Sequence, residues 1–272
     1  MKNLTRMWLA GCLLGSFATS AFADDDSPVS DEPAGQYGVL RDVQGPAGMF
    51  SARILLDINL SKDAAGKPIS IAPDLYYGVS EKLQLGLLHT DPTGWQSRPG
   101  VGLCLTGKDG GCPKVYDNIG FDVLYALGAG NFPISAHGSL FIDSFDPTTT
   151  HLALGIAGKA HFNDHVALLF DPKLAIALDS RDTNKDALYV PLELEFQLKP
   201  PTILKLLTGI SGTTSGFGDT YQIPLGLGLL QNLNRRFDLG ARFSFDNLLG
   251  KQPADVGRAD LRSFAILLNV RS

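Results

Sequence analysis

The chain of 272 residues lacks any long apolar run after its first two dozen residues. A membrane-spanning helix needs roughly 18 or more consecutive apolar residues. The sequence after Ala23 therefore excludes helical membrane spans. If this part of the chain lies in a membrane, it must do so as a closed β-barrel, because only helices and closed barrels satisfy every backbone hydrogen bond in lipid.

An excess of positive charge is also missing. The chain has 23 Lys and Arg against 28 Asp and Glu, a formal net charge of -5, and loss of Lys2 and Arg6 with a signal peptide would change -5 to -7. This balance argues against nucleic acid as a partner. Phosphate-loop and dinucleotide spacings are absent as well, so we expect no cofactor.

Cysteine is scarce, with three residues in the whole chain. Cys104 and Cys112 lie close together in a Gly-rich stretch, and an even pair in an exported chain is typical of one disulfide. The sequence predicts a Cys104–Cys112 disulfide, and two free thiols are the alternative.

The N-terminus has the pattern of a secretory signal. Lys2 and Arg6 precede an apolar core, and Ala21-Phe22-Ala23 is a small-x-small cleavage site. Leu9 to Cys12 also matches a lipoprotein box, which leaves lipidation of Cys12 as an alternative. We therefore predict a signal peptide over residues 1–23, a flexible acidic segment over residues 24–45 and one large all-β domain over residues 46–272.

Strand-like alternation fills this last region. In Pro68 to Thr90, apolar residues of one parity run up to the polar turn Ser80-Glu81-Lys82 and resume after it, as in a β-hairpin. The same pattern predicts about twelve strands of a length that crosses a bilayer at a tilt. They are Met49–Leu60, Ile69–Val79, Leu83–Thr90, Asn118–Leu127, Ile134–Asp143, His151–Phe162, His165–Leu178, Leu188–Lys199, Thr202–Ile210, Asp219–Gln231, Phe237–Asp246 and Asp260–Arg271.

Long and short connections alternate along these strands. The odd-numbered links are long and polar, among them the Cys-bearing link and SFDPTTT, whereas even-numbered links such as SEK, ND and PPT are tight. Outer-membrane barrels have this asymmetry, with long outward loops and short periplasmic turns. It places both chain ends on the periplasmic side.

The two faces of the strands differ in polarity. One parity is aliphatic and aromatic, as in Leu188 to Leu198, and the other carries charge, as for a polar lumen inside a lipid-facing wall. In TILKLLTGI, from Thr202 to Ile210, neither parity is polar throughout, so the pattern fails there. The predicted lumen charges are Arg53, Asp57, Asp74, Asp122, Asp143, Lys159, Asp171, Lys173, Glu193, Glu195, Asp238, Arg242 and Asp246.

Taken with the signal and the link asymmetry, these features make the chain resemble the bacterial outer-membrane β-barrel proteins over nearly all of its mature length. The resemblance implies an up-and-down antiparallel barrel in the outer membrane, with lipid and the barrel-insertion machinery as partners. The chain departs from the family at its end, because many members finish on Phe and this chain finishes on Ser272. A soluble periplasmic β-protein is the alternative fold class.

For function, the excess of inward carboxylates predicts a passive small-solute channel with a weak cation preference. A surface barrel with a filled lumen, which the N-terminal segment could plug, is one alternative. A lipid-modifying enzyme is another. No G-x-S-x-G elbow occurs, and the candidates for a Ser-His pair are His137 with Ser135 or Ser139, and His151 with Ser144.

One further pair of residues has the chemistry of metal ligands. His161 and His165 flank a three-residue turn and could face each other across a hairpin. Two ligands do not make a metal site, so we predict no metal.

Overall fold

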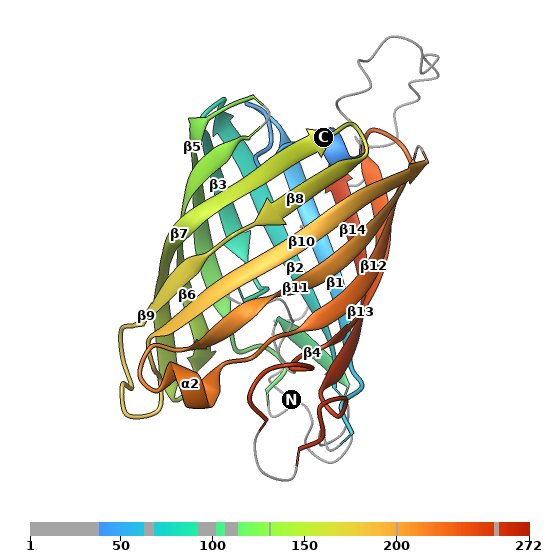
Figure 1. Ribbon diagram of the computed structural model, residues 1–272. Coiled ribbons are helices and arrows are strands. Elements are labelled where there is room, and N and C mark those ends of the chain that lie inside the picture. The colour runs from blue at the N-terminus through green and yellow to red at the C-terminus, as the bar shows by residue number, and fades with distance from the viewer. Residues whose placement is uncertain are drawn as a thin grey trace, which may run out of the picture.

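The structure is a computed structural model that describes residues 38–62, 68–91, 102–106, 114–130, 132–199, 201–252 and 256–272. Over these residues the chain forms a closed antiparallel barrel of twelve strands (Figure 1). Strand β1 (Phe50–Asn59) pairs with both β2 and the C-terminal β14, which closes the barrel. None of the helices in the described part of the chain is long and apolar enough to span a membrane.

The remaining strands follow one another around the barrel in chain order. They are β2 (Ile69–Ser80), β3 (Leu83–Leu88), β4 (Leu103–Thr106), β5 (Ile119–Gly128), β6 (Ile134–Phe145), β7 (Thr148–Asn163), β8 (Val166–Phe170), β9 (Lys173–Ala177), β10 (Ala187–Lys199), β11 (Thr202–Thr213), β12 (Leu225–Asn232), β13 (Phe237–Phe245) and β14 (Arg262–Arg271). A short helix, α2 (Phe217–Thr220), and a 3-10 turn, η2 (Gly38–Leu40), complete the described elements.

Fourteen labelled strands make twelve barrel strands because two of the twelve are interrupted. β8 and β9 both pair with β7 and β10 in one continuous register, and the ladder breaks at Asp171-Pro172, opposite Pro191. Proline has no N–H to donate to a ladder. The third barrel strand consists of β3 and, after the long connection, β4, which pairs with the start of β2.

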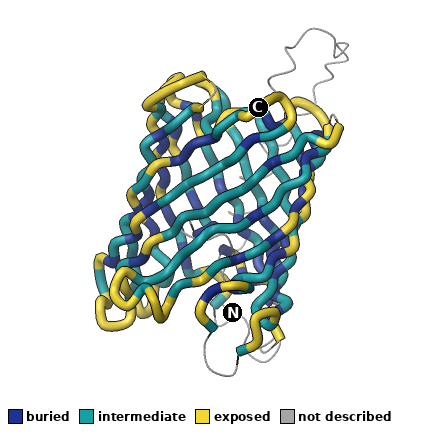
Figure 2. Tube along the Cα trace, viewed as in Figure 1, coloured by how far each residue is buried: buried dark blue, intermediate teal, exposed yellow. Residues whose placement is uncertain are grey.

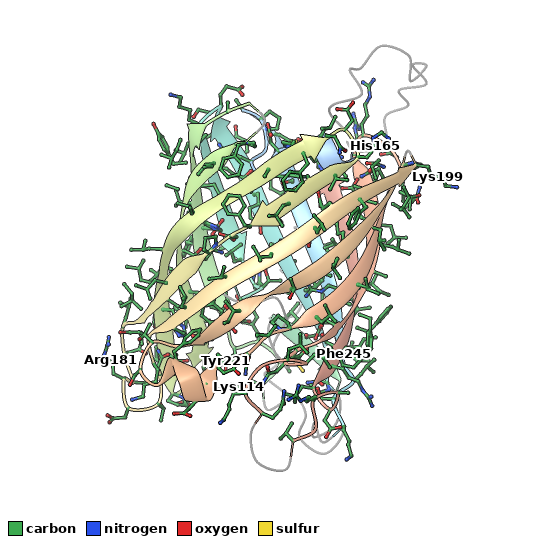
Figure 3. The ribbon with its side chains drawn as sticks, viewed as in Figure 1. Lys114, His165, Arg181, Lys199, Tyr221 and Phe245 are labelled. Carbon is green, nitrogen blue, oxygen red and sulfur yellow. The ribbon has the colours of Figure 1, made fainter. Side chains whose placement is uncertain are left out.

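The two ends of the barrel differ in their connections. We call one the turn end, where short links join β2 to β3, β5 to β6, β7 to β8, β10 to β11 and β12 to β13, and the other the loop end. The C-terminus lies at the turn end, beside the start of β1, where the Ser272 N–H donates to the Phe50 carbonyl (Figure 1). Charged side chains such as Lys199 mark the turn end, and Lys114 and Arg181 mark the loop end (Figure 3).

The structure corrects the predicted boundaries in four places. The Cys-bearing link is not all loop, because its residues 103–106 form the barrel strand β4. The link SFDPTTT is not a long loop, because β6 and β7 run to within two residues of each other and only Asp146-Pro147 lies between them. The predicted strand Asp219–Gln231 begins only at Leu225, since residues 217–220 form α2. The predicted strand His165–Leu178 is the interrupted pair β8 and β9.

Burial alternates along the strands as the two faces require (Figure 2). In β1 the inward side chains of Leu55, Asp57 and Asn59 are buried. The outward wall exposes large apolar side chains around the barrel, among them Phe121 at 61% and Leu227 at 58%. A continuous apolar exterior around a polar interior is the reverse of a water-soluble barrel.

Candidate functional site

The lumen contains a cavity of about 1910 Å³. Its lining runs from the turn end, at Pro201 and Arg236, to Arg53 and Asp91 farther toward the loop end. Inward side chains of nearly every barrel strand contribute to it, because the period-2 alternation turns every second residue to the same space. About half of the residues that line the cavity are polar or charged, and the charged side chains of the inner wall form four bonded groups.

The first group is centred on Asp74, whose side chain is fully buried. The Arg53 guanidinium donates to Asp74 Oδ2 from Nε at 3.1 Å and from Nη2 at 2.6 Å, and it lies 5.6 Å from the centre of the Tyr76 ring. Asp74 Oδ1 accepts from the backbone N–H groups of His89 and Thr90. The carboxylate therefore holds β1, β2 and the chain after β3 together.

The second group is centred on His137 in β6. Its Nε2 lies 2.7 Å from Asp122 Oδ1 in β5, and its Nδ1 lies 2.8 Å from Asp171 Oδ1. Lys173 Nζ contacts the other oxygen of Asp171 at 2.7 Å, and Ser139 Oγ donates to Asp122. Carboxylates accept hydrogen bonds, so this arrangement is satisfied when the imidazole carries both of its protons.

The third group is a chain of alternating charges on β7, β10 and β11. Lys159 Nζ lies 2.6 Å from Glu195 Oε2, and Lys205 Nζ lies 2.9 Å from Glu195 Oε1 and 2.6 Å from Glu193 Oε1. Strands β7, β10 and β11 are thereby joined on the inner face of the barrel, across β8, which lies between β7 and β10. Such pairing is what allows charges to remain in a partly dry wall.

The fourth group is at the turn end, around the buried Asp238 of β13. Asp238 accepts from Asn232 at 2.7 Å and from Asn269 at 3.3 Å, and it forms ion pairs with Arg271 and with Arg41. Arg41 belongs to the segment that precedes β1. The inner wall therefore binds part of the N-terminal segment.

The other predicted lumen charges lie toward the loop end. Arg242 lines the cavity, and Asp57 and Asp246 lie close enough for their charges to interact with it. Asp143 forms an ion pair with His151 and does not line the described cavity.

Comparisons with known proteins bear on the fold. No family model matches the chain, and no characterised protein matches it in sequence. The solved structures that share its architecture include two porins. The NanC porin has a TM-score of 0.55 and 6% identity over 81% of this chain and 98% of its own. The KdgM porin in complex with disordered oligogalacturonate has a TM-score of 0.53 and 8% identity over the same shares. The chain has the fold of a bacterial outer-membrane β-barrel.

Within this outer-membrane-type barrel, the candidate serines have partners other than a histidine base. Ser139 donates to Asp122 at 2.6 Å, and both ring nitrogens of His137 face carboxylates. Ser135 lies 3.5 Å from the Gln44 side chain. Ser144 donates to Asp117 at 2.8 Å. The lumen groups thus favour a charged wall rather than a nucleophile and base.

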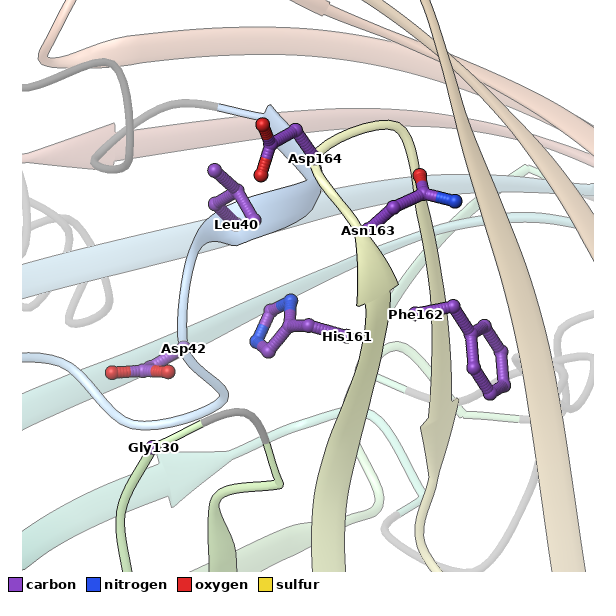
Figure 4. Close-up of a pocket in the computed structure, with 7 residues that line it drawn as sticks. All are labelled: Leu40, Asp42, Gly130, His161, Phe162, Asn163 and Asp164. Atoms are coloured by element: carbon purple, nitrogen blue, oxygen red, sulfur yellow. The ribbon is translucent and has the colours of Figure 1, made fainter.

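His161 and His165 do not face each other across the barrel hairpin. His161 is in register with Ala167, and His165 lies in the turn. His161 instead lines a small pocket of about 320 Å³ at the turn end with Asp42 and Asp164 (Figure 4). In the described ranges, no group of three or more His, Cys, Asp or Glu has the arrangement of a metal site.

Two parts of the lumen wall were missed by the sequence pattern. Lys205 lies in TILKLLTGI, where apolar residues of both parities hide the inward face, and Arg41 lies in a stretch without periodicity. Lys205 would have been found from its position opposite Glu195, which the hairpin register of β10 and β11 sets. No local signal in the sequence could have placed Arg41.

The loop end of the barrel holds its own carboxylate contacts. Burial raises the pKa of Asp117, but the Phe145 N–H, Lys114 and Ser144 all donate to its carboxylate. Together these three donors bring the pKa below its ordinary value. The Ala177 N–H and Arg181 likewise lower the pKa of Asp186. Cys104, in β4, is disulfide-bonded. Cys112 lies outside the described residues, so the Cys104–Cys112 pairing remains a prediction.

Proposed function

We propose that the chain is an outer-membrane β-barrel that forms a passive channel for small solutes. The observation that carries the proposal is the lumen cavity of about 1910 Å³, lined by charged and polar groups. Pockets that hold one drug-sized ligand are typically about 300–1,000 Å³. A space of this size inside a polar wall can hold water and hydrated solutes along much of the barrel.

The exterior supports the membrane location. Exposed Leu, Phe, Tyr, Val and Ile side chains surround the barrel between its two charged rims. A monomeric soluble protein rarely exposes a contiguous apolar surface of more than a few hundred Å². The fold is similar to that of the NanC and KdgM porins, which supports a channel function in general terms.

The finer part of the proposal is a weak cation preference. Toward the loop end, the carboxylates Asp57, Asp74 and Asp246 outnumber Arg53 and Arg242. The described cavity as a whole lacks the predicted excess of carboxylates, because its lining has nine Lys and Arg against eight Asp and Glu. The expected cation preference therefore depends on the carboxylates toward the loop end. Charged rings in pores set ion preference, so we expect a small one here.

Single-channel recording in planar bilayers tests the proposal. We expect discrete conductance steps, and a small reversal potential under a salt gradient with the sign of cation flow. Folded protein that gives no conductance would reject the channel in favour of a barrel with a filled lumen. A reversal potential of the opposite sign would reject the cation preference alone.

A further inference from the structure

Residues 38–45, which we call the strap, enter the barrel at the turn end and lie against its inner wall. A turn at Pro46 to Met49 connects the strap to β1, with Met49 N–H donating to the Pro46 carbonyl and Gly48 at a φ of 79°. Positive φ at the third residue is the type II turn geometry, which Gly adopts without strain. Gly48 and Met49 also bond to Gly78 of β2, so the turn is fixed to the wall.

The strap has one apolar anchor. Val39 is 1% exposed and packs against Ala167, Ile203 and Leu230 on the inner face of three strands. The three strands thereby provide an apolar position on the inner wall, and Val39 of the strap occupies it.

Polar contacts surround this anchor. Arg41 Nη1 lies 2.8 Å from Asp238 Oδ2, and the Arg41 carbonyl accepts from Lys159 Nζ at 3.0 Å. The backbone N–H of Val39 donates to the Gln197 side chain, and that of Gly45 to the Gln84 side chain. Each contact comes from a different strand of the barrel.

The charged wall groups that hold the strap also have partners in the wall itself. Asp238 retains Arg271, Asn232 and Asn269 without Arg41. Lys159 retains Glu195 at 2.6 Å. Undocking the strap would therefore leave no buried charge unpaired, which is the costly outcome when an ion pair is broken. Water in the lumen can replace the remaining contacts.

We propose that the strap is a displaceable plug that narrows the lumen at the turn end and limits conductance. The inference rests on the proposed channel function. Strap residues from Leu40 to Gly45 line the cavity, so they occupy part of its cross-section. One apolar residue, one ion pair and a few hydrogen bonds hold the strap, and the turn after it is fixed to the wall. The strap can therefore leave the wall while β1 stays in place.

The test uses the full mature chain with Arg41→Gln, which removes the ion pair to Asp238. Loss of one charge-assisted hydrogen bond shifts a docking equilibrium by on the order of tenfold. We expect Arg41→Gln to raise the mean conductance in planar bilayers. Val39→Asp, which places a charge in the apolar docking position, should do the same. Lys62→Gln is the matched control, because it also removes one positive charge but from an exposed side chain at the loop end.

A second measurement follows the strap itself. In a Val39→Cys variant, we expect a water-soluble maleimide to modify the introduced thiol slowly, and on the order of tenfold faster once Arg41→Gln is added. If all three variants, Arg41→Gln, Val39→Asp and Lys62→Gln, conduct equally, the proposed plug is overturned but the proposed channel is not. Absence of conductance in every variant would reject the channel and, with it, the plug. Fast modification of the introduced thiol with Arg41 intact would show that the strap is not docked.

Discussion

Glu195 illustrates how single residues keep charge inside the wall. Its two carboxylate oxygens contact Lys159 and Lys205, and all three side chains are at least four-fifths buried. A buried ion is costly unless it is paired, and each oxygen here has its own cation. Single ion pairs also occur on the inner wall, at Asp74 with Arg53 and at Asp171 with Lys173.

Replacing Glu195 with Gln should destabilise the barrel more than replacing Glu193 with Gln. Glu195→Gln leaves Lys159 without a carboxylate partner, and removal of one member of a buried pair costs about 3–5 kcal/mol. Glu193→Gln leaves Lys205 its contact with Glu195, so no buried charge loses its last carboxylate partner and we expect a clearly smaller loss. Urea unfolding in lipid vesicles compares the two variants. Equal losses would contradict the assignment of Glu195 as the shared partner.

The sequence pattern predicted these residues to different degrees. Alternation alone turned Arg53, Glu193 and Glu195 to the polar face, because a period of two fixes the side of every residue once one is known. It failed at Ile203 and Lys205, since Ile203 is apolar and yet faces inward, where Val39 of the strap covers it. That contact joins residues far apart in the sequence, and no local pattern encodes it.

At the scale of strands and loops, turn chemistry was easier to predict than element boundaries. Short links were predicted where polar residues separate two apolar runs, as at Ser80 to Lys82 and at Asn163 to His165. The prediction of a long loop around Asp146-Pro147 was wrong because the threonines after it have high strand propensity and join β7. Polar residues there pair with β6 instead of forming a loop.

The loop between β9 and β10 should loosen in acid. The Ala177 N–H and Arg181 lower the folded-state pKa of Asp186 below its unfolded value of about 3.9. A depressed carboxyl pKa contributes stability above the unfolded pKa, and this contribution is lost as the pH falls through the folded pKa. Amide hydrogen exchange of residues 178–186 should therefore stay slow above about pH 4, once corrected for the intrinsic rate, and rise below it.

Asp186→Asn supplies the control for this effect. The variant cannot titrate at position 186, so its loop should show no additional opening in acid. If the loop of the native chain opens at the same pH as that of Asp186→Asn, the contacts of Asp186 are not the cause.

The disulfide of Cys104, in β4, should be made with Cys112, which follows it in the sequence. Closing a ring this short constrains the unfolded chain by roughly 2–3 kcal/mol on the loop-entropy estimate. Intact mass measured without reduction, before and after alkylation, checks the bond. Two alkylatable thiols in the mature protein would contradict it.

For the whole molecule, the two faces of the wall differ in polarity and the two ends of the barrel differ in their connections. The lumen side is charged and internally paired, the outside is apolar, and short turns gather at the end where the strap enters. Loop asymmetry and face polarity were both predictable from the sequence, because each depends only on neighbours along the chain. The docking of the strap was not, because it depends on the closed barrel.

The outward face allows a direct test of which solvent surrounds the barrel. Ile266 and Val270 lie on the same face of β14, Ile266 near mid-height and Val270 near the turn end. An arginine facing lipid at the bilayer midplane costs about 2–4 kcal/mol, and one near the interface about 0–1 kcal/mol. We therefore expect Ile266→Arg to lower the free energy of unfolding in vesicles markedly and Val270→Arg to leave it nearly unchanged. If the barrel were surrounded by water, an arginine in place of Ile266, which is 37% exposed, would cost little, and both variants would match the parent.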